Sequence, residues 1–477
     1  MYIETRCLLF SNKCVKVNIG DFSMKVAVIG TGYVGLNTAV ALAYCGHNVI
    51  GIDVDETKIE KLNNGIPVIS EEGLPELLKE LIVGDNLSFT SKYDVIADRD
   101  VVFVTVGTPS NKDGSANLSY IFAVVNSIID ELNKIKEINH NITIVIKSTV
   151  PFGVNEQIQR MIRDKVNNKS ISDHLLFASN PEFLREGTAL YDTFYPDRII
   201  IGSNDRAKEV LSEMYKPILN REFKELKFID KNKVPEKLPE LLQTDQVSAE
   251  MIKYASNCFL ALKVSYANEI EKLAEKIGAN MKDISKGMGM DKRIAPYFLN
   301  SGLGWGGSCF PKDTLAMMAI AKEYNMEMPI IKAAVDVNNN QIDRVIQKVM
   351  NELFTLHGKK IAVFGITFKP NTDDVRNSLS VDLCYKLKSL GADIYMTDPC
   401  GLDNAKEIYK DSGFNFISSP YDAAKDADAV IVATDWNEYK SLDYEKVKEV
   451  MRSPIMIDTR NILFNSKYKE IFTYHHM

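Results

Sequence analysis

A strand, a glycine-rich turn and a helix follow one another near the start of the chain, and this order constrains the fold more than any other feature. Residues 25–30 are an apolar run typical of a buried strand, and residues 33–46 have helical spacing that ends at Gly46. Residues 48–53 are predicted to form the next strand. Two strands joined by a helix make a βαβ unit, which predicts a parallel sheet with helices on its faces.

The turn carries the spacing GxGxxG in Gly30, Gly32 and Gly35, and Asp53 ends the second strand. Glycines at these places allow a tight turn, close approach of the backbone to a pyrophosphate, and close packing of helix on strand. A carboxylate at the end of the second strand hydrogen-bonds a ribose 2′-hydroxyl and repels a 2′-phosphate. The pattern favours NAD over NADP, the alternative being a βα turn that binds no ligand.

The alternation of strands and helices continues and predicts a doubly wound sheet. Its further strands are expected within residues 100–107, 142–150, 175–183 and 197–202. The hydroxyl groups of Thr108, Ser110, Ser148 and Thr149 follow two of these strands, where they would either contact a cofactor or cap the strand.

The second half of the chain repeats the α/β pattern after a long helix. Residues 246–278 predict a single helix of about nine turns, which would lie between domains or at a subunit interface. Residues 221–243 before it are charged, contain two prolines, and predict a loop or linker. A smaller second sheet is expected from the apolar runs at 359–368, 392–398, 428–435 and 454–460. The predicted fold class is α/β, with two Rossmann-like doubly wound domains joined by a long central helix.

Composition limits the possible functions. A chain of 477 residues is too long for one hydrophobic core, and a net charge of −7 argues against general nucleic-acid binding. No apolar run approaches the roughly 18 residues of a membrane span. The seven cysteines are scattered, without CxxC or a metal-binding Cys/His spacing, which suits free thiols in a reducing cytoplasm and implies no metal. Residues 1–23 lack the features of a signal peptide and are interpreted as an optional extension without a role.

One cysteine stands out. Three glycines and a proline surround Cys309 and predict an irregular loop, and the positive charge of Lys312 would favour a thiolate. A thiolate beside a nicotinamide suggests capture of an aldehyde as a thiohemiacetal, oxidation to a thioester, and release of an acid by water that Asp313 would hold. The alternative is a small core side chain. That second interpretation is adopted for Cys45, Cys258 and Cys384, which lie in apolar helical runs.

Several segments, in this order, resemble the UDP-glucose/GDP-mannose dehydrogenase family from Met24 to about Leu463: "GTGYVG", "KSTVPFG", "SNPEFLREGTALYDTFYPDRIIIG", "AEMIKYASNCFLALKVSYANEI", "GWGGSCFPKDT" and "FGITFKPNTDDVRNS". The family oxidises the C6 alcohol of a sugar nucleotide to a carboxylate with two NAD and one cysteine. "REGTALYD" and "GGSCFPKD" are more similar to its UDP-glucose branch. The resemblance therefore implies four-electron oxidation of UDP-glucose to UDP-glucuronate through an aldehyde, a thiohemiacetal and a thioester on Cys309.

The resemblance also implies catalytic roles beside this nucleophile. Lys253 would stabilise the developing oxyanion and assist proton transfer, and Asn257, one helical turn later, would donate a further hydrogen bond. Asp313 and Thr149 would hold the catalytic water, and Glu182 would assist thioester hydrolysis.

Binding residues are implied in the same way. Contacts to NAD are implied for Gly30, Thr31, Gly32, Tyr33, Val34, Gly35, Asp53, Lys58, Thr108, Thr149, Glu186, Lys312 and Arg376. Contacts to UDP-glucose are implied for Glu182, Phe183, Leu184, Arg185, Lys253, Asn257, Arg293, Asn300, Gly302, Gly306, Phe368, Lys369 and Arg460. Arg293 would come from a neighbouring subunit, in keeping with a homodimer through the long helix.

With these roles the predicted domains are an extension (1–23), an NAD-binding domain (24–220), a linker (221–243), a central helical dimerisation region with the cysteine loop (244–345), and a UDP-sugar-binding domain (346–477). Two positions depart from the family pattern: Ala295 stands where glycine is usual, and Trp305 replaces Tyr or Phe. The linker is longer and more charged than usual.

Three alternatives remain open. The first keeps the chemistry but takes GDP-mannose or a UDP-N-acetylhexosamine. The second is a two-electron dehydrogenase of 6-phosphogluconate type, which would have no use for Cys309. The third is a catalytically silent NAD-binding module.

Overall fold

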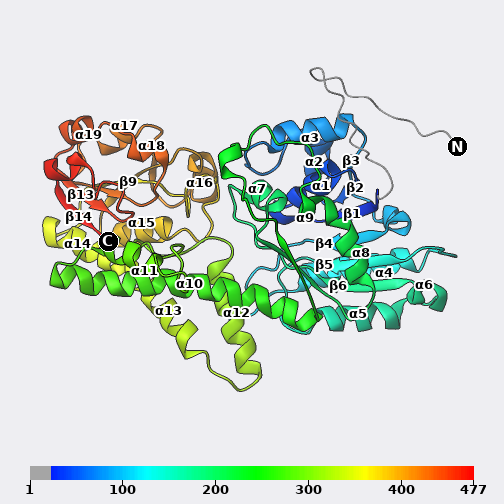
Figure 1. The fold of residues 1–477 in the computed structure, drawn as a ribbon. Helices are drawn as coiled ribbons and strands as arrows, with labels where there is room; N and C mark the ends of the chain where they lie inside the picture. The colour runs from blue at the N-terminus through cyan, green and yellow to red at the C-terminus, as the bar shows by residue number, and fades with distance from the viewer. Residues whose placement is uncertain (1–22) are drawn as a thin grey trace.

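The structure is a computed structural model that describes residues 23–477, so the predicted extension lies outside the described residues except for Ser23. Within the described residues, the first sheet has eight strands in the order β3-β2-β1-β4-β5-β6-β7-β8. Figure 1 labels the strands from β3 to β6. Their bounds, in that order, are Leu87–Thr90, Asn48–Ile52, Lys25–Ile29, Val101–Val104, Ile142–Ile146, Leu175–Ser179, Arg198–Gly202 and Glu240–Thr244. Neighbouring strands are parallel except β6 and β7, which meet antiparallel at Ser179 and Gly202.

Helices cover both faces of this sheet, as predicted for a doubly wound fold. Val26 and Val28 of β1 pack into the cluster that includes α1 and α3, whereas Ala27 and Ile29 pack into the cluster that includes α4 and α5. The helices are α1 (Tyr33–Tyr44), α2 (Glu56–Asn63), α3 (Leu74–Val83), α4 (Ser119–Leu132), α5 (Val154–Lys165), α6 (Lys169–Asp173), α7 (Ala189–Phe194), α8 (Ala207–Met214) and α9 (Lys216–Asn220). Short 3₁₀ turns lie at Asp94–Asp98 and Lys231–Lys233.

The segment predicted as a loop, residues 221–243, ends in a strand. Strand β8 pairs in parallel with β7, with Arg198 opposite Glu240 and Gly202 opposite Thr244. The loop prediction is therefore wrong for residues 240–243. Strand β8 closes an edge of the sheet and is mostly exposed, so its sequence lacks the apolar pattern of the inner strands.

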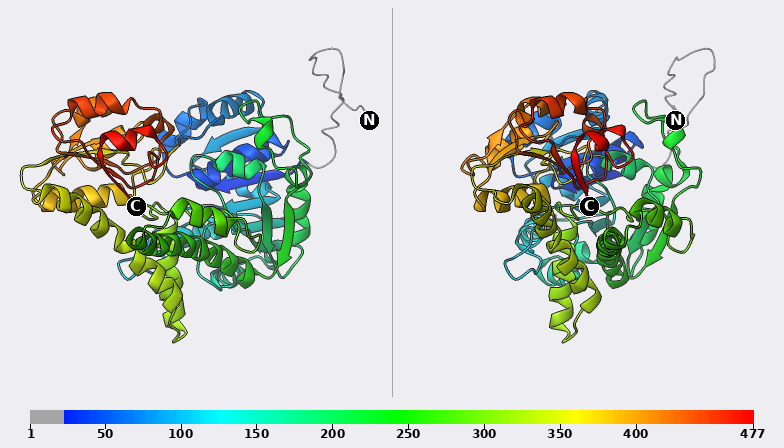
Figure 2. Two further views of the ribbon diagram at one scale, coloured as in Figure 1. Left: turned by 60° about the vertical axis from the view of Figure 1, so that its left-hand side comes forward. Right: turned by 90° about the vertical axis from the view of Figure 1, so that its left-hand side faces the viewer.

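The predicted long helix is confirmed as α10, Gln246–Ile277. Asp245 begins it by accepting a 2.8 Å hydrogen bond from the backbone N–H of Ser248, and Gly278 ends it in the left-handed conformation at φ 72°. Figures 1 and 2 show α10 running beneath both domains. The other central helices are α11 (Met281–Gly289), α12 (Phe310–Glu323), α13 (Pro329–Asn339) and α14 (Gln341–Leu353).

The second sheet has the order β11-β10-β9-β12-β13-β14, and all of its pairs are parallel. Its strands, in that order, are Asn415–Phe416, Asp393–Thr397, Lys360–Phe364, Ala429–Val432, Ile455–Asp458 and Thr473–His476. Its helices are α15 (Leu379–Ser389), α16 (Leu402–Ile408), α17 (Pro420–Ala424), α18 (Asn437–Lys440) and α19 (Tyr444–Val450), with a 3₁₀ turn at Lys467–Ile471. Two Rossmann-like domains and a central helix are thus present, as predicted.

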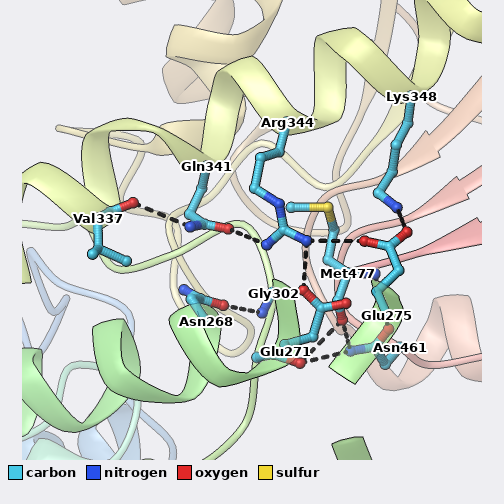
Figure 3. Close-up of polar contacts among 11 residues, drawn as sticks. Asn268, Glu271, Glu275, Gly302, Val337, Gln341, Arg344, Lys348, Asn461 and Met477 are labelled. Carbon is cyan, nitrogen blue, oxygen red and sulfur yellow. Dashed lines mark hydrogen bonds and ion pairs between the residues drawn. The ribbon is translucent and has the colours of Figure 1, made fainter. Parts of the chain in front are cut away.

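Charged and amide side chains fasten the second domain to α10 (Figure 3). Arg344 of α14 donates to buried Glu271 at 2.6 Å and to Glu275 at 3.1 Å, and Lys348 also pairs with Glu275. One turn earlier on α10, Asn268 Oδ1 accepts a 2.7 Å hydrogen bond from the backbone N–H of Gly302. Helix α10 therefore holds both the second domain and the loop before the cysteine.

Among the described residues, no helix is long and apolar enough to cross a membrane.

Candidate active site

The glycine turn has the geometry that a dinucleotide requires. Gly30 adopts φ 99°, a left-handed conformation that favours glycine, and a Cβ on Gly35 would lie 1.8 Å from the Gly30 carbonyl oxygen. A Cβ on Gly32 would meet nothing within 4 Å, so the space above the turn is open. The start of α1 thus presents free N–H groups to this space, which suits a pyrophosphate.

Asp53 ends β2 beside the turn and is held by it. Its Oδ2 accepts hydrogen bonds from the Thr31 backbone N–H at 2.9 Å and the Thr31 hydroxyl at 2.7 Å, and its Oδ1 accepts one from the Asp55 N–H at 3.1 Å. Burial acts to raise the pKa of Asp53, but these hydrogen bonds and the charge of Lys58 lower it overall. The carboxylate is therefore ionised, as contact with a ribose hydroxyl requires.

A cavity of about 660 Å³ lies between α2 and the second domain, and Lys58, Glu71 and Asp373 are among its lining residues. Tyr33 of α1 donates a 3.1 Å hydrogen bond to Asp373 across the two domains. The predicted cofactor residues Tyr33 and Lys58 therefore lie where the domains face each other.

The centre of the site is a buried ion pair. Lys253 of α10 donates a 2.7 Å hydrogen bond to Glu182, which lies in the loop after β6, and both side chains are nearly inaccessible to solvent. Burial would lower the pKa of Lys253, but Glu182, Cys309 and Asp313 raise it overall. Burial would likewise raise the pKa of Glu182, yet Lys253 and the backbone N–H of Leu184 bring it below its usual value. Each charge stabilises the ionised form of the other.

Cys309 immediately precedes α12, a helix of 14 residues. The positive end of the helix favours a thiolate there. Burial raises the pKa of the thiol, and although the positive charge of Lys253 lowers it, the pKa stays above its usual value. This differs from the sequence argument, which gave the cationic role to Lys312; the Lys312 ammonium instead pairs with Asp313.

Asp313 is fully buried one turn into α12. Its Oδ2 accepts a 2.6 Å hydrogen bond from Asn257 of α10, and its Oδ1 accepts one from Lys312. Thr149 lines a cavity of about 10 Å³ together with Lys253, and the Thr149 carbonyl accepts a 2.8 Å hydrogen bond from Thr108. The structure thus brings together the side chains that the sequence predicted to be catalytic.

The loop before the cysteine is enclosed by the second domain. Leu303 N–H donates to the Thr459 carbonyl at 3.1 Å, and a Cβ on Gly306 would lie 2.3 Å from the Asn377 carbonyl oxygen. Gly307 packs on the ring of Phe368. Arg460, two residues after the end of β13, donates a 3.4 Å hydrogen bond to the Gly304 carbonyl of the loop. Because the loop has no room for larger side chains, Gly302 and Gly306 are structural requirements whatever they bind.

Other predicted substrate residues have partners within the chain. Arg185 makes a bidentate contact with Asp192, at 2.5 Å and 3.0 Å. The guanidinium of Arg198 lies 4.0 Å from the centre of the Phe183 ring. Lys369 is half-buried near Glu186, and Arg376, which was predicted to contact NAD, pairs with Asp374.

Two predicted substrate residues lie exposed on this chain. Arg293 is almost fully exposed and pairs with Asp291, and Asn300 is exposed at the start of the loop.

Sequence reasoning missed three polar residues near these groups. Glu71 accepts hydrogen bonds from the backbone N–H groups of Gly187 at 2.6 Å and Ala189 at 2.9 Å, at the end of the loop that carries Glu182. Lys147 is buried and donates to Asn180 at 3.0 Å, and burial lowers its pKa to about 8. Ser308 donates to Glu186 at 2.6 Å. Of these three residues, Ser308 is the one that the sequence could have indicated, because it stands directly before Cys309.

Three models of the UDP-glucose/GDP-mannose dehydrogenase family match the chain: the NAD binding domain over residues 24–219, the central domain over 247–340, and the UDP binding domain over 362–465. The UDP-glucose 6-dehydrogenase of Rickettsia conorii is 40% identical over 453 residues, which cover 94% of this chain and 98% of that protein. The UDP-glucose 6-dehydrogenase of Bacillus subtilis is 40% identical over 441 residues, covering 92% and 93%.

Solved structures agree with these sequence matches. A UDP-glucose dehydrogenase from Pyrobaculum islandicum superposes with a TM-score of 0.84 at 36% identity, covering 96% of this chain and 98% of that one. A UDP-D-ManNAc dehydrogenase from Pyrococcus horikoshii superposes with a TM-score of 0.80 at 25% identity, covering 95% and 99%.

A dinucleotide turn, a long central helix and a second nucleotide-binding domain define an NAD-dependent dehydrogenase. More specifically, the chain belongs to the UDP-glucose/GDP-mannose dehydrogenase family. The predictions of the family and of NAD as cofactor are confirmed. The exact domain boundaries and the individual binding contacts stay predictions.

Proposed function

We propose that the chain oxidises the C6 alcohol of UDP-glucose to the carboxylate of UDP-glucuronate, in two steps on one active site. The observation that carries this proposal is the placement of Cys309 beside the buried pair of Lys253 and Glu182, with Asp313 one turn further along α12. A nucleophile, a buried cation and two carboxylates are what aldehyde capture and thioester hydrolysis need. A two-electron dehydrogenase has no use for the thiol.

Each residue has a role that follows from its surroundings. NAD, when bound, accepts hydride in each of the two oxidations. Lys253 is charged and buried near the Cys309 sulfur, so it would stabilise the oxyanion that forms when the thiolate adds to the aldehyde. Asn257 is oriented by Asp313 and would donate to the same oxyanion. Glu182 would accept a proton from the water that hydrolyses the thioester.

UDP-glucose is the substrate that the relatives favour. The proteins named as UDP-glucose 6-dehydrogenases are 40% identical to this chain, and the structure named as a UDP-glucose dehydrogenase is 36% identical. The enzyme named for UDP-D-ManNAc is 25% identical and superposes slightly less well. Oxidation of another sugar nucleotide is the second candidate.

The experiment is a count of reducing equivalents. With excess NAD and limiting UDP-glucose, we expect two NADH per sugar nucleotide at completion and an acid product. Cys309→Ala should produce no acid while still binding NAD. One NADH per sugar would remove the thioester from the mechanism. No NADH with UDP-glucose, but two with GDP-mannose or UDP-N-acetylmannosamine, would change the substrate and keep the chemistry.

A homodimer through α10 is part of the proposal. Phe259, Tyr266, Leu273 and Ile277 are exposed at intervals of seven, seven and four residues, which puts them on one stripe of the helix. An exposed apolar stripe of this length is typical of a protein interface. Arg293 projects from the nearby loop and would enter the partner's site.

We also propose that the enzyme works in the cytoplasm, where its free cysteines stay reduced.

A further inference from the structure

A hydroxyl group links the nucleophile to a second buried carboxylate. Ser308 Oγ donates a 2.6 Å hydrogen bond to Glu186 Oε1 and lies 3.6 Å from Cys309 Sγ, where either atom can donate. The other carboxylate oxygen, Glu186 Oε2, is buried and has no hydrogen-bond partner among the described residues. Sulfur, hydroxyl and carboxylate therefore form a continuous path.

The other charged groups near the thiol are already occupied. In the resting site Lys253 is protonated and paired with Glu182, so moving the thiol proton to Glu182 would leave the buried Lys253 charge without a partner before any oxyanion has formed. Asp313 is held by Asn257 and by Lys312. Burial raises the pKa of Cys309, Lys253 lowers it, and Glu182 and Asp313 raise it. The thiol thus needs a proton acceptor other than these three.

Glu186 is suited to that task. Burial raises its pKa to about 7, with Ser308 lowering it and Asp374 raising it, while Arg376 and Lys369 lower it. A carboxylate whose pKa lies near the working pH takes up and returns a proton readily.

We propose that Ser308 relays the proton of the Cys309 thiol to Glu186, an inference that rests on the proposed function and supplies its missing activation step. The S–H bond breaks as its proton passes to Ser308 Oγ, and the hydroxyl proton of Ser308 passes to Glu186 Oε1. The products are a thiolate, an intact hydroxyl that now donates to it, and a neutral carboxylic acid. No electrons are gained or lost, and the proton returns when the carbon–sulfur bond of the thioester breaks.

The relay has a signature in the reactivity of the thiol. Because Cys309 and Glu186 share one proton, they titrate as a pair. The relay operates only while Glu186 is ionised and can accept a proton. The rate at which Cys309 reacts by this route should therefore rise up to about pH 7, as Glu186 ionises, and then level off until direct loss of the thiol proton to water takes over. A thiol that loses its proton directly to water becomes about tenfold more reactive with each pH unit until its own pKa.

The test is the rate of alkylation by iodoacetamide as a function of pH, followed on the Cys309 peptide by mass spectrometry in the full-length protein without substrate. Wild type should show the shoulder above about pH 7. Ser308→Ala and Glu186→Gln should lose it, with rates that rise about tenfold per pH unit. Ser308→Thr keeps the hydroxyl and should keep the shoulder.

Ser265→Ala is the matched control. Ser265 is a buried serine that accepts a 2.9 Å hydrogen bond from Trp305, in the same glycine-rich loop, without touching Cys309. It should keep the shoulder. A shoulder that persists in Ser308→Ala, or that wild type lacks, would overturn the relay. Alkylation needs no turnover, so the two proposals can fail separately. If wild type lacks the shoulder but forms two NADH per sugar nucleotide, the relay is wrong and the proposed function stands. If the shoulder is present but two NADH do not form, the proposed function is wrong and the relay stands.

Discussion

Lys253 shows how much one buried charge can do for the site. It is the partner of Glu182 and the cation that acts on Cys309, so it stabilises one anion at rest and another during the reaction. Lys253 and Cys309 could be recognised from the sequence because each lies in a segment that resembles a family motif. The pairing of Lys312 with Asp313 was not, because adjacent residues give no sign of which neighbour a long side chain chooses.

Lys253→Ala should lower turnover by about 10²–10⁴-fold, since it removes oxyanion stabilisation and assistance in proton transfer. NAD affinity should change little, because Lys253 is hydrogen-bonded to Glu182 and not to a residue of the glycine turn. The measurements are steady-state kinetics and a titration with NAD. Lys359→Met is the control, since it removes a lysine that pairs with buried Asp428 in the second domain rather than with Glu182. Equal losses of turnover in the two variants would contradict the role given to Lys253.

Ala295 occupies a position that its backbone makes unfavourable for alanine. Its φ is 61°, in the left-handed region, where a Cβ is disfavoured and glycine is not. Ala295→Gly should therefore stabilise the protein by about 1 kcal/mol against chemical denaturation. Ala255→Gly, in the middle of α10, should destabilise it by about the same amount. Effects of the same sign would refute this account.

At the scale of elements, the strands that sequence reasoning missed are the edges of the sheets. Strands β3 and β8 close the first sheet, and β11 and β14 close the second. Inner strands such as β4 and β5 are buried on both faces and read as continuous apolar runs, which made them predictable. An edge strand is stabilised by hydrogen bonds to one neighbour only, and its sequence carries little of that information.

Glu71 connects the loop before α3 to the loop that carries Glu182, and its charge makes this connection depend on pH. Burial outweighs the hydrogen bonds from Gly187 and Ala189 and raises the pKa of Glu71 from 4.5 to about 7. The folded protein therefore binds this proton more tightly than the unfolded chain does. The stabilisation is complete below pH 4.5 and is lost as the pH rises to about 7.

Comparison with Glu71→Gln isolates this contribution. The stability of wild type relative to Glu71→Gln should fall by up to about 3 kcal/mol between pH 4.5 and 7, and stay level above that, in urea unfolding at fixed ionic strength. Glu72→Gln changes an exposed neighbour and serves as the control. A difference that grows with pH would have the wrong sign and would exclude this explanation.

At the scale of the whole molecule, α10 has one face buried in the chain and an opposite face that is exposed. One face holds Lys253 and Asn257 for the site and Glu271 for the second domain, and all three are buried. The opposite stripe, from Phe259 to Ile277, is exposed and apolar. Helical periodicity in the sequence predicted the helix, but it could not say which apolar residues faced the interior and which stayed exposed.

Phe259→Glu should convert the proposed dimer to monomer, because a charge would be buried at the centre of the stripe. Sedimentation velocity should show the loss of mass. Turnover should fall with dissociation if Arg293 serves the partner's site, and NAD binding should persist. Tyr120→Glu, an exposed aromatic on α4, is the control and should leave the mass unchanged. A wild-type monomer at micromolar concentration would contradict the dimer directly.

The hydrogen bonds of Asp53 also bear on attempts to re-engineer the cofactor preference. The carboxylate that would exclude a 2′-phosphate is the same group that holds Thr31 in the turn and the N–H of Asp55 after β2. Replacing Asp53 with a smaller neutral side chain would remove the charge that disfavours NADP. The same replacement would remove the hydrogen bonds that hold the turn. Cofactor choice in this chain is therefore coupled to loop rigidity, and a route to NADP use would have to replace those three hydrogen bonds before it removed the charge.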